Sequence, residues 1–166
     1  MLKGTITVHK HESKILRSNP LRDPHIREVI IYLPPEYTKS SSRGYIAVFG
    51  LVGFGGQGKM LLNADPLKEN IEDKMNRLIS EKKCGPMVLV LLDCFTRFGG
   101  NQYINSSAIG RYEDYIIREI VPFVDKNYNI SCGLGPLLWR LWFNRVGYAA
   151  SRSIPSLSRS LWRLSL

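Results

Sequence analysis

The glycine-rich stretch from Gly53 to Gly58, G-F-G-G-Q-G, is the part of this sequence whose residue types most directly suggest chemistry. Glycines let a backbone approach a ligand closely, so that peptide N–H groups can donate hydrogen bonds to a negatively charged oxygen. A phosphate-binding loop is excluded because Lys59 is not in P-loop spacing. A dinucleotide-binding loop is excluded because Asp93 follows after about forty residues rather than roughly twenty. A tight turn without a ligand is the alternative interpretation.

A second candidate is the long polar segment from Asp93 to Ser107, which directly follows the apolar run M-V-L-V-L-L. Open α/β sheets bind their ligands at the carboxyl ends of the strands. We therefore expect Gln102, Tyr103 and Asn105 to line a substrate cleft. A surface loop satisfied by its own hydrogen bonds is the alternative.

Cysteine and histidine form no metal-ligand pattern in this chain. The cysteines are odd in number and lack C-x-x-C spacing, so the sequence predicts neither a disulfide framework nor a zinc site. The histidines precede or border the second predicted strand, and we expect them to be solvated. We predict no metal and no cofactor. The residues concerned are Cys84, Cys94 and Cys132, with His9, His11 and His25.

Alternating or apolar runs bounded by Gly, Pro and polar residues predict the elements that must position these loops. Strands are expected over residues 3–8, 27–33, 45–50 and 87–92, and helices over 66–82 and 111–127. Pro66 fits the first turn of one helix, and Pro122 is predicted to kink the other. Helix-length connections between strands favour an α/β fold with a mostly parallel sheet and helices on both faces.

Four motifs resemble, in order, those of the esterase family that includes the esterase D type enzymes, a branch of the α/β-hydrolases. The resemblance covers about residues 26–128. It implies a partial α/β-hydrolase fold and hydrolysis of a small-molecule carboxylic ester by an enzyme serine, with no cofactor. The motifs are Y-L-P-P-E-Y at 32–37, F-G-L-V-G-F-G-G at 49–56, D-C-F-T-R-F-G-G-N-Q-Y-I-N-S at 93–106 and G-R-Y-E-D-Y at 110–115.

The resemblance also implies roles for residues. In this family the loop after the third strand supplies half of the oxyanion hole, which assigns Gly53, Phe54 and Gly55, with the Phe54 N–H as the donor. The family's nucleophilic Ser follows later, and its Asp and His later still. Leu137 stands at the serine position, and the sequence as given stops before the Asp and His are expected. We therefore assign no catalytic residue and expect this chain to be inactive.

Residues 133–166 differ in composition from the rest, with no Lys, Asp or Glu, five Arg and all three Trp. Trp has the single codon TGG, so a shift of one base downstream converts Trp139 and Trp142 to Gly. Ordinary codons for residues 135–144 then allow G-H-S-S-G-G-Y-G-S-I, which contains the nucleophile turn G-x-S-x-G. We therefore expect residues 1–132 to be the N-terminal part of an esterase domain, truncated near its fifth strand. Residues 133–166 are expected to be an out-of-frame, poorly ordered tail.

The charge of the chain allows one rival function. The formal net charge is +9, and it falls to +4 without the five tail arginines. No basic stripe with interleaved aromatic residues is present, so nucleic acid is not expected as a partner. The rival is a small basic binding module whose Arg/Trp-rich tail attaches to an anionic membrane surface or partner. We expect no membrane attachment, and the absence of a signal-peptide-like apolar run makes the cytoplasm the expected location.

Overall fold

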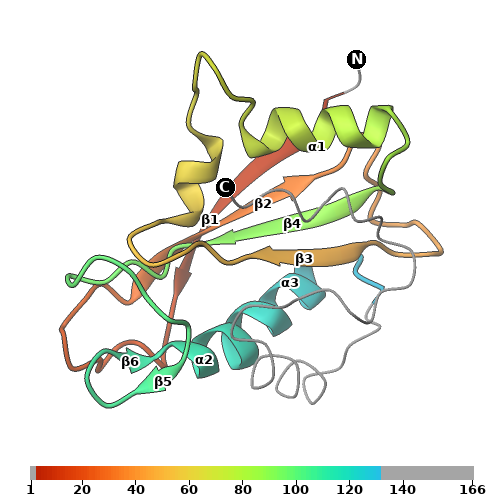
Figure 1. The fold of residues 1–166 in the computed structure, drawn as a ribbon. Helices are drawn as coiled ribbons and strands as arrows, with labels where there is room; N and C mark the ends of the chain where they lie inside the picture. The colour runs from red at the N-terminus through yellow and green to blue at the C-terminus, as the bar shows by residue number, and fades with distance from the viewer. Residues whose placement is uncertain (1–2, 132–166) are drawn as a thin grey trace.

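The computed structural model describes residues 3–131, and these build one four-stranded mixed sheet between two helical layers (Figure 1). The strand order is β1-β2-β4-β3. A short two-stranded hairpin, β5-β6, directly precedes α2. The bounds are β1 Thr5–Glu12, β2 Ile26–Leu33, β3 Ile46–Gly50, η1 Gly58–Leu62, α1 Ile71–Ser80, β4 Met87–Leu92, β5 Asn105–Ser106, β6 Gly110–Arg111, α2 Tyr112–Tyr115, η2 Ile116–Ile120 and α3 Val121–Asn127.

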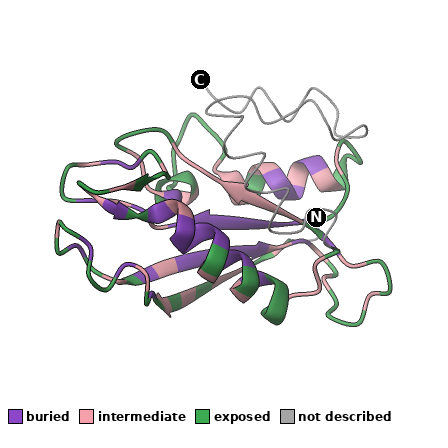
Figure 2. Ribbon diagram, turned by 90° about the horizontal axis from the view of Figure 1, so that it is seen from below, coloured by how far each residue is buried: buried purple, intermediate pink, exposed green. Residues whose placement is uncertain are grey.

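Strand β4 and the second half of β2, from Val29 to Leu33, are apolar on both faces because helices cover both sides of the sheet. Alternate residues point to opposite faces, which divides the core into two clusters. Figure 2, seen from below, shows the central strands as buried and the helical segment in front of them as buried over part of its length. One cluster joins the sheet to the α2–α3 segment through Val29, Ile31, Val88, Val90, Tyr112, Ile116, Ile120 and Val124. The other joins it to α1 through Ile30, Tyr32, Met75, Leu89 and Leu91.

The sheet is mixed, whereas a mostly parallel sheet was expected. Strand β2 pairs antiparallel with both β1 and β4, and β3 pairs parallel with β4. Parallel pairing needs a crossover of helix length. The segments 13–25 and 34–45 contain no helix, so they cannot supply one. The prediction of helices on both faces is confirmed: α1 covers one side of the sheet, and α2 and α3 cover the other (Figure 1).

Helix α1 begins later than predicted. The Oδ1 atom of Asn70 accepts a hydrogen bond from the backbone N–H of Asp73 at 2.9 Å and caps the helix. An Asn cap satisfies one of the free N–H groups of the first turn, which fixes the start at Ile71. Pro66 therefore lies before the helix and not in its first turn.

The segment from α2 to α3 is helical throughout, as predicted, but contains the π-helical stretch η2. Pro122 lies in the first turn of α3, directly after η2. Proline lacks the N–H that would continue the regular ladder, and a wider turn before it accommodates the missing bond. The irregularity expected at Pro122 therefore takes the form of a π-helical turn.

The prediction of solvated histidines is wrong for His9 and His11. The Nε2 atom of His9 lies 2.6 Å from the hydroxyl of Tyr128. His11, with 18% of its side chain exposed, lies 3.5 Å from Glu119. His9 and His11 are two positions apart on β1, so both side chains point to the sheet face that the α2–α3 segment covers. They are therefore half-buried.

The described chain ends beside β3. Tyr45, which precedes β3, forms an isolated parallel bridge with Ile130. The Tyr45 N–H donates to Asn129 O at 2.8 Å, and the Ser131 N–H donates to Tyr45 O at 2.9 Å. The predicted tail, including the nucleophile position at Leu137, lies outside the described residues. No helix within residues 3–131 is long and apolar enough to cross a membrane.

Candidate active site

The two candidate loops lie together because β3 and β4 are parallel neighbours, so their carboxyl ends share one edge of the sheet. The glycine loop, residues 51–58, follows β3. The polar loop, residues 93–107, follows β4. The glycine loop then crosses the end of β4: a Cβ on Gly58 would lie 2.7 Å from Leu92 O and 2.8 Å from Leu92 N. This approach requires glycine.

The polar loop packs against the tip of the glycine loop. A Cβ on Gly100 would collide with the backbone N of Gly55 and would lie 2.8 Å from the Cα of Phe54. The two backbones are thus in direct contact. A side chain at Gly100 would push them apart.

Tyr103 joins the loops through its hydroxyl. The phenolic O–H donates to the carbonyl of Val52 at 2.7 Å, and the same oxygen accepts the N–H of Val52 at 3.0 Å. Burial raises the pKa of Tyr103 to about 12, so the hydroxyl is protonated at neutral pH. The Oδ1 atom of Asn101 accepts the Tyr103 N–H at 2.5 Å and holds Tyr103 at a φ of 56°.

The tip of the glycine loop contains backbone N–H groups that have no hydrogen-bond acceptor among the described residues. The Gly56 N–H donates to Gly53 O at 3.0 Å and closes a turn. Among the described residues, no acceptor receives the N–H groups of Phe54 or Gly55. Residue Phe54 is 65% exposed. Free N–H groups at an exposed turn can stabilise a negatively charged oxygen without breaking an existing hydrogen bond.

The three residues predicted to line a cleft have different environments in the structure. Gln102 is exposed at the loop surface. Tyr103 turns inward to Val52. Asn105 is exposed in β5, and its Oδ1 accepts the N–H of Asp114 at 3.1 Å, which ties the end of the polar loop to α2.

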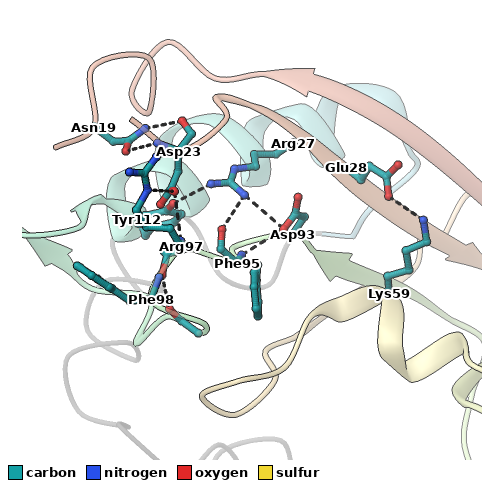
Figure 3. Close-up of polar contacts among 12 residues, drawn as sticks. Asn19, Asp23, Arg27, Glu28, Lys59, Asp93, Phe95, Arg97, Phe98 and Tyr112 are labelled. Carbon is teal, nitrogen blue, oxygen red and sulfur yellow. Dashed lines mark hydrogen bonds and ion pairs between the residues drawn. The ribbon is translucent and has the colours of Figure 1, made fainter. Parts of the chain in front are cut away.

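A buried arginine fixes the base of the polar loop (Figure 3). Arg27, on β2, is 3% exposed. Its Nη1 donates to Phe95 O at 2.8 Å and lies 3.4 Å from Asp93 Oδ1, and its Nη2 donates to Tyr112 OH at 2.9 Å. One guanidinium thereby connects β2, the first residues of the polar loop and α2. Its planar fork suits several acceptors at once.

A buried carboxylate, that of Asp23, holds the middle of the polar loop. Asp23 is 7% exposed, and its Oδ1 accepts the backbone N–H of Arg97 at 3.2 Å. Asn19 holds Asp23 in place by bonding both its backbone N–H and its carbonyl, at 2.9 and 2.8 Å. Figure 3 shows Asp23 and Arg27 approaching the loop from neighbouring positions.

The described residues of this edge contain no activated nucleophile. Cys94 lies two residues after the end of β4, but it is 4% exposed and burial raises the pKa of its thiol. A buried, protonated thiol is a poor nucleophile. Within residues 3–131 no group of three or more His, Cys, Asp or Glu side chains is placed to hold a metal ion.

Sequence reasoning missed Arg27, Asp23, Asn101 and Gly100. A signal for Arg27 was present, since a charged residue inside an otherwise apolar strand must find partners when buried. Gly100 gave a weaker signal as the second glycine of a pair. Asp23 and Asn101 carried none, because their contacts depend on how the loops fold over the sheet.

No family model matches the chain, and a search of curated proteins finds no match. Solved structures do match. A ferulic acid esterase is 18% identical with a TM-score of 0.62, covering 78% of this chain and 46% of its own. The S954A mutant of the feruloyl esterase module from Clostridium thermocellum, complexed with sinapinate, is 15% identical with a TM-score of 0.55, covering 79% and 38%. An S-formylglutathione hydrolase from Agrobacterium tumefaciens is 16% identical with a TM-score of 0.52, covering 81% and 48%.

This chain thus spans less than half of the length of these solved structures. Their named activities differ, while the arrangement of strands and helices is shared. At these identities the likeness concerns the fold. The described residues have an α/β fold that matches part of the α/β-hydrolase fold of these esterases.

Proposed function

We propose that residues 3–131 are the oxyanion-hole half of a carboxylic ester hydrolase that uses a serine nucleophile. The observation that carries the proposal is the exposed turn after β3, where the N–H groups of Phe54 and Gly55 have no acceptor among the described residues. An ester carbonyl placed there would gain hydrogen bonds as its oxygen becomes negative during acyl transfer. The resemblance of the sequence motifs to an esterase family and the fold of the solved neighbours support the same reaction class.

In this account Phe54 N–H is the donor from this half of the site. The substrate is a small-molecule ester that binds along the glycine and polar loops. The reaction forms an acyl-enzyme on the serine and releases the alcohol, and water then releases the acid. The chain's own described residues orient the carbonyl and stabilise its oxygen.

The polypeptide with the given sequence should not perform this reaction. It contains no G-x-S-x-G, and Leu137 occupies the nucleophile position. We propose that residues 133–166 are translated out of frame, as their Trp and Arg content indicates. The codons that would supply the serine turn are present but are read one base away.

A paired assay tests this proposal. The chain as given and a frame-restored chain, with one base removed near the codons of Ser131 to Gly133, are assayed on p-nitrophenyl acetate. We expect the restored chain to hydrolyse the ester and the given chain to show no turnover above background, because losing a triad costs on the order of a million-fold in rate. Equal activity of the two chains, or no activity in the restored chain, contradicts the proposal.

A further inference from the structure

Apart from the packing of Gly100 against Phe54 and Gly55, the glycine loop has two backbone restraints within the described residues. Its tip is closed by the Gly56-to-Gly53 turn, and Gly58 fixes its far end against Leu92. Neither contact sets the direction of the peptide units that enter the tip. That direction is set at Val52, one residue before the turn.

Val52 is held by one side chain. The Tyr103 hydroxyl bonds both the N–H and the carbonyl of Val52, at 3.0 and 2.7 Å. Two hydrogen bonds to the two backbone groups of a single residue restrict its rotation about both φ and ψ. The position of the Phe54 N–H, two residues on, follows from this restriction.

Tyr103 is itself held in place. The hydrogen bond from its N–H to Asn101 maintains its positive φ, a conformation that is uncommon for a non-glycine residue. Its ring is half-buried within the core cluster under the loops. Such conformations persist where surrounding contacts enforce them and occur often at functional sites.

We propose that Tyr103 is a positioning residue, whose hydroxyl aims the backbone donors of the glycine loop at the developing oxyanion. This inference rests on the proposed function. It departs from the expectation that Tyr103 lines the substrate cleft, because the hydroxyl is already engaged by Val52. Its effect should fall on the transition state rather than on substrate binding, since an oxyanion donor acts mainly when charge develops.

The first test uses the full chain as given. Hydrogen–deuterium exchange is followed by mass spectrometry over residues 51–56 in the wild type and in Tyr103→Phe. Phenylalanine keeps the ring and the backbone conformation and removes only the hydroxyl. We expect exchange of the Val52 N–H in this segment to rise about thirtyfold, the size expected for losing two ordinary hydrogen bonds. Unchanged exchange overturns the proposal.

The matched control is Tyr45→Phe. The Tyr45 hydroxyl accepts the backbone N–H of Thr38 at 3.1 Å, at the opposite end of β3. The Tyr45→Phe substitution removes the same atom from the same kind of residue, and it should leave exchange over residues 51–56 unchanged.

The second test separates positioning from structure and from substrate contact. In the frame-restored chain, Tyr103→Phe should lower kcat on p-nitrophenyl acetate about tenfold with KM changed by less than about twofold. Tyr45→Phe should change neither. A raised KM at constant kcat would instead identify a substrate contact, and unchanged kinetics would identify a purely structural residue. Either result overturns the proposal.

The two tests also distinguish failure of this inference from failure of the proposed function. A restored chain that is inactive even with Tyr103 intact contradicts the proposed function, and a positioning role in that reaction falls with it. An active restored chain with unaltered kinetics in Tyr103→Phe leaves the esterase proposal standing and rejects only the role of Tyr103.

Discussion

Gly100 lies directly against Gly55, so closely that a Cβ on Gly100 would collide with the Gly55 backbone N. The contact joins the loop after β4 to the loop after β3. It is a direct backbone contact between the two segments that the sequence singled out for chemistry. Backbone stacking of this kind depends on a glycine, since every other residue would separate the loops.

The substitution Gly100→Ala should therefore loosen the candidate site. We expect a loss of about 1–3 kcal/mol in the free energy of unfolding, the usual cost of forcing an added methyl into a close contact. Urea denaturation measures it. Gly85→Ala is the control, because nothing lies within 4 Å of a Cβ there, and it should cost less than about 1 kcal/mol. Equal values for the two variants would show that the loops are not in contact.

Removing the guanidinium of Arg27 should lower the free energy of unfolding more than Gly100→Ala does. Arg27→Met leaves Phe95 O and Tyr112 OH without their donor and Asp93 without its cation, and we expect a loss of roughly 2–5 kcal/mol. Arg27→Lys keeps the charge but not the planar fork, so it should recover only part of the loss.

The control for Arg27 is Lys59→Ala. Lys59 lies 3.5 Å from Glu28 in an exposed ion pair, shown in Figure 3. Its loss should cost less than about 1 kcal/mol. If Arg27→Met costs no more than Lys59→Ala in thermal or urea unfolding, the buried network does not hold the polar loop.

The stability of the chain should fall at alkaline pH through its buried phenols. Burial raises the pKa of Tyr103 from 10.0 to about 12. A raised pKa means that the stability supplied by the neutral hydroxyl is complete below about pH 10 and is lost as pH rises towards 12. A shift of one pKa unit corresponds to about 1.36 kcal/mol, and Tyr103 is partly exposed. The loss of unfolding free energy that comes from Tyr103 is therefore less than about 2.7 kcal/mol.

Comparing the wild type with Tyr103→Phe isolates the part of this loss of stability that comes from the Tyr103 hydroxyl. Tyr32 and Tyr112, whose pKa values are also raised to about 12, remain in both proteins. The variant should thus show a shallower fall in unfolding free energy between pH 10 and 12. Parallel pH profiles for the two proteins would mean that the Tyr103 hydroxyl is not buried against Val52.

Several strands and helices of the fold can be predicted from the local sequence pattern. The run at Met87–Leu92 is apolar throughout and bounded by Pro86 and Asp93, and β4 has these limits. Helix α1 is shorter than predicted because it begins after the Asn70 cap and not at Pro66. The order and direction of the strands depend on which connections hold a helix, and a mixed sheet emerged where a parallel one was expected.

The contacts of the candidate site were less predictable. Both loops could be placed at one sheet edge from the strands that precede them. The Tyr103–Val52 hydrogen bonds join residues 51 positions apart, and Arg27 lies 66 positions from Asp93. Such pairs arise only once strand register and loop conformation are set, so residue types alone do not reveal them.

The reading frame can be examined at the gene. Sequencing the locus should reveal that deleting one base, or restoring two, near the codons of Ser131 to Gly133 opens a frame of roughly a hundred codons. That frame should encode G-x-S-x-G first, then an Asp and finally a His, the chain order of α/β-hydrolases. An early stop codon in the shifted frame would reject the frame-shift explanation of the Arg/Trp-rich tail.

The most direct measurement is covalent labelling of the frame-restored chain with a fluorophosphonate, followed by mass spectrometric mapping of the adduct. Such reagents react with serines that an adjacent base and an oxyanion hole activate. We predict one adduct, on the serine that the shifted frame encodes at the position of Leu137, and no adduct on the chain as given. A restored chain that folds but stays unlabelled, or is labelled elsewhere, would contradict the assignment of residues 3–131 to a serine ester hydrolase.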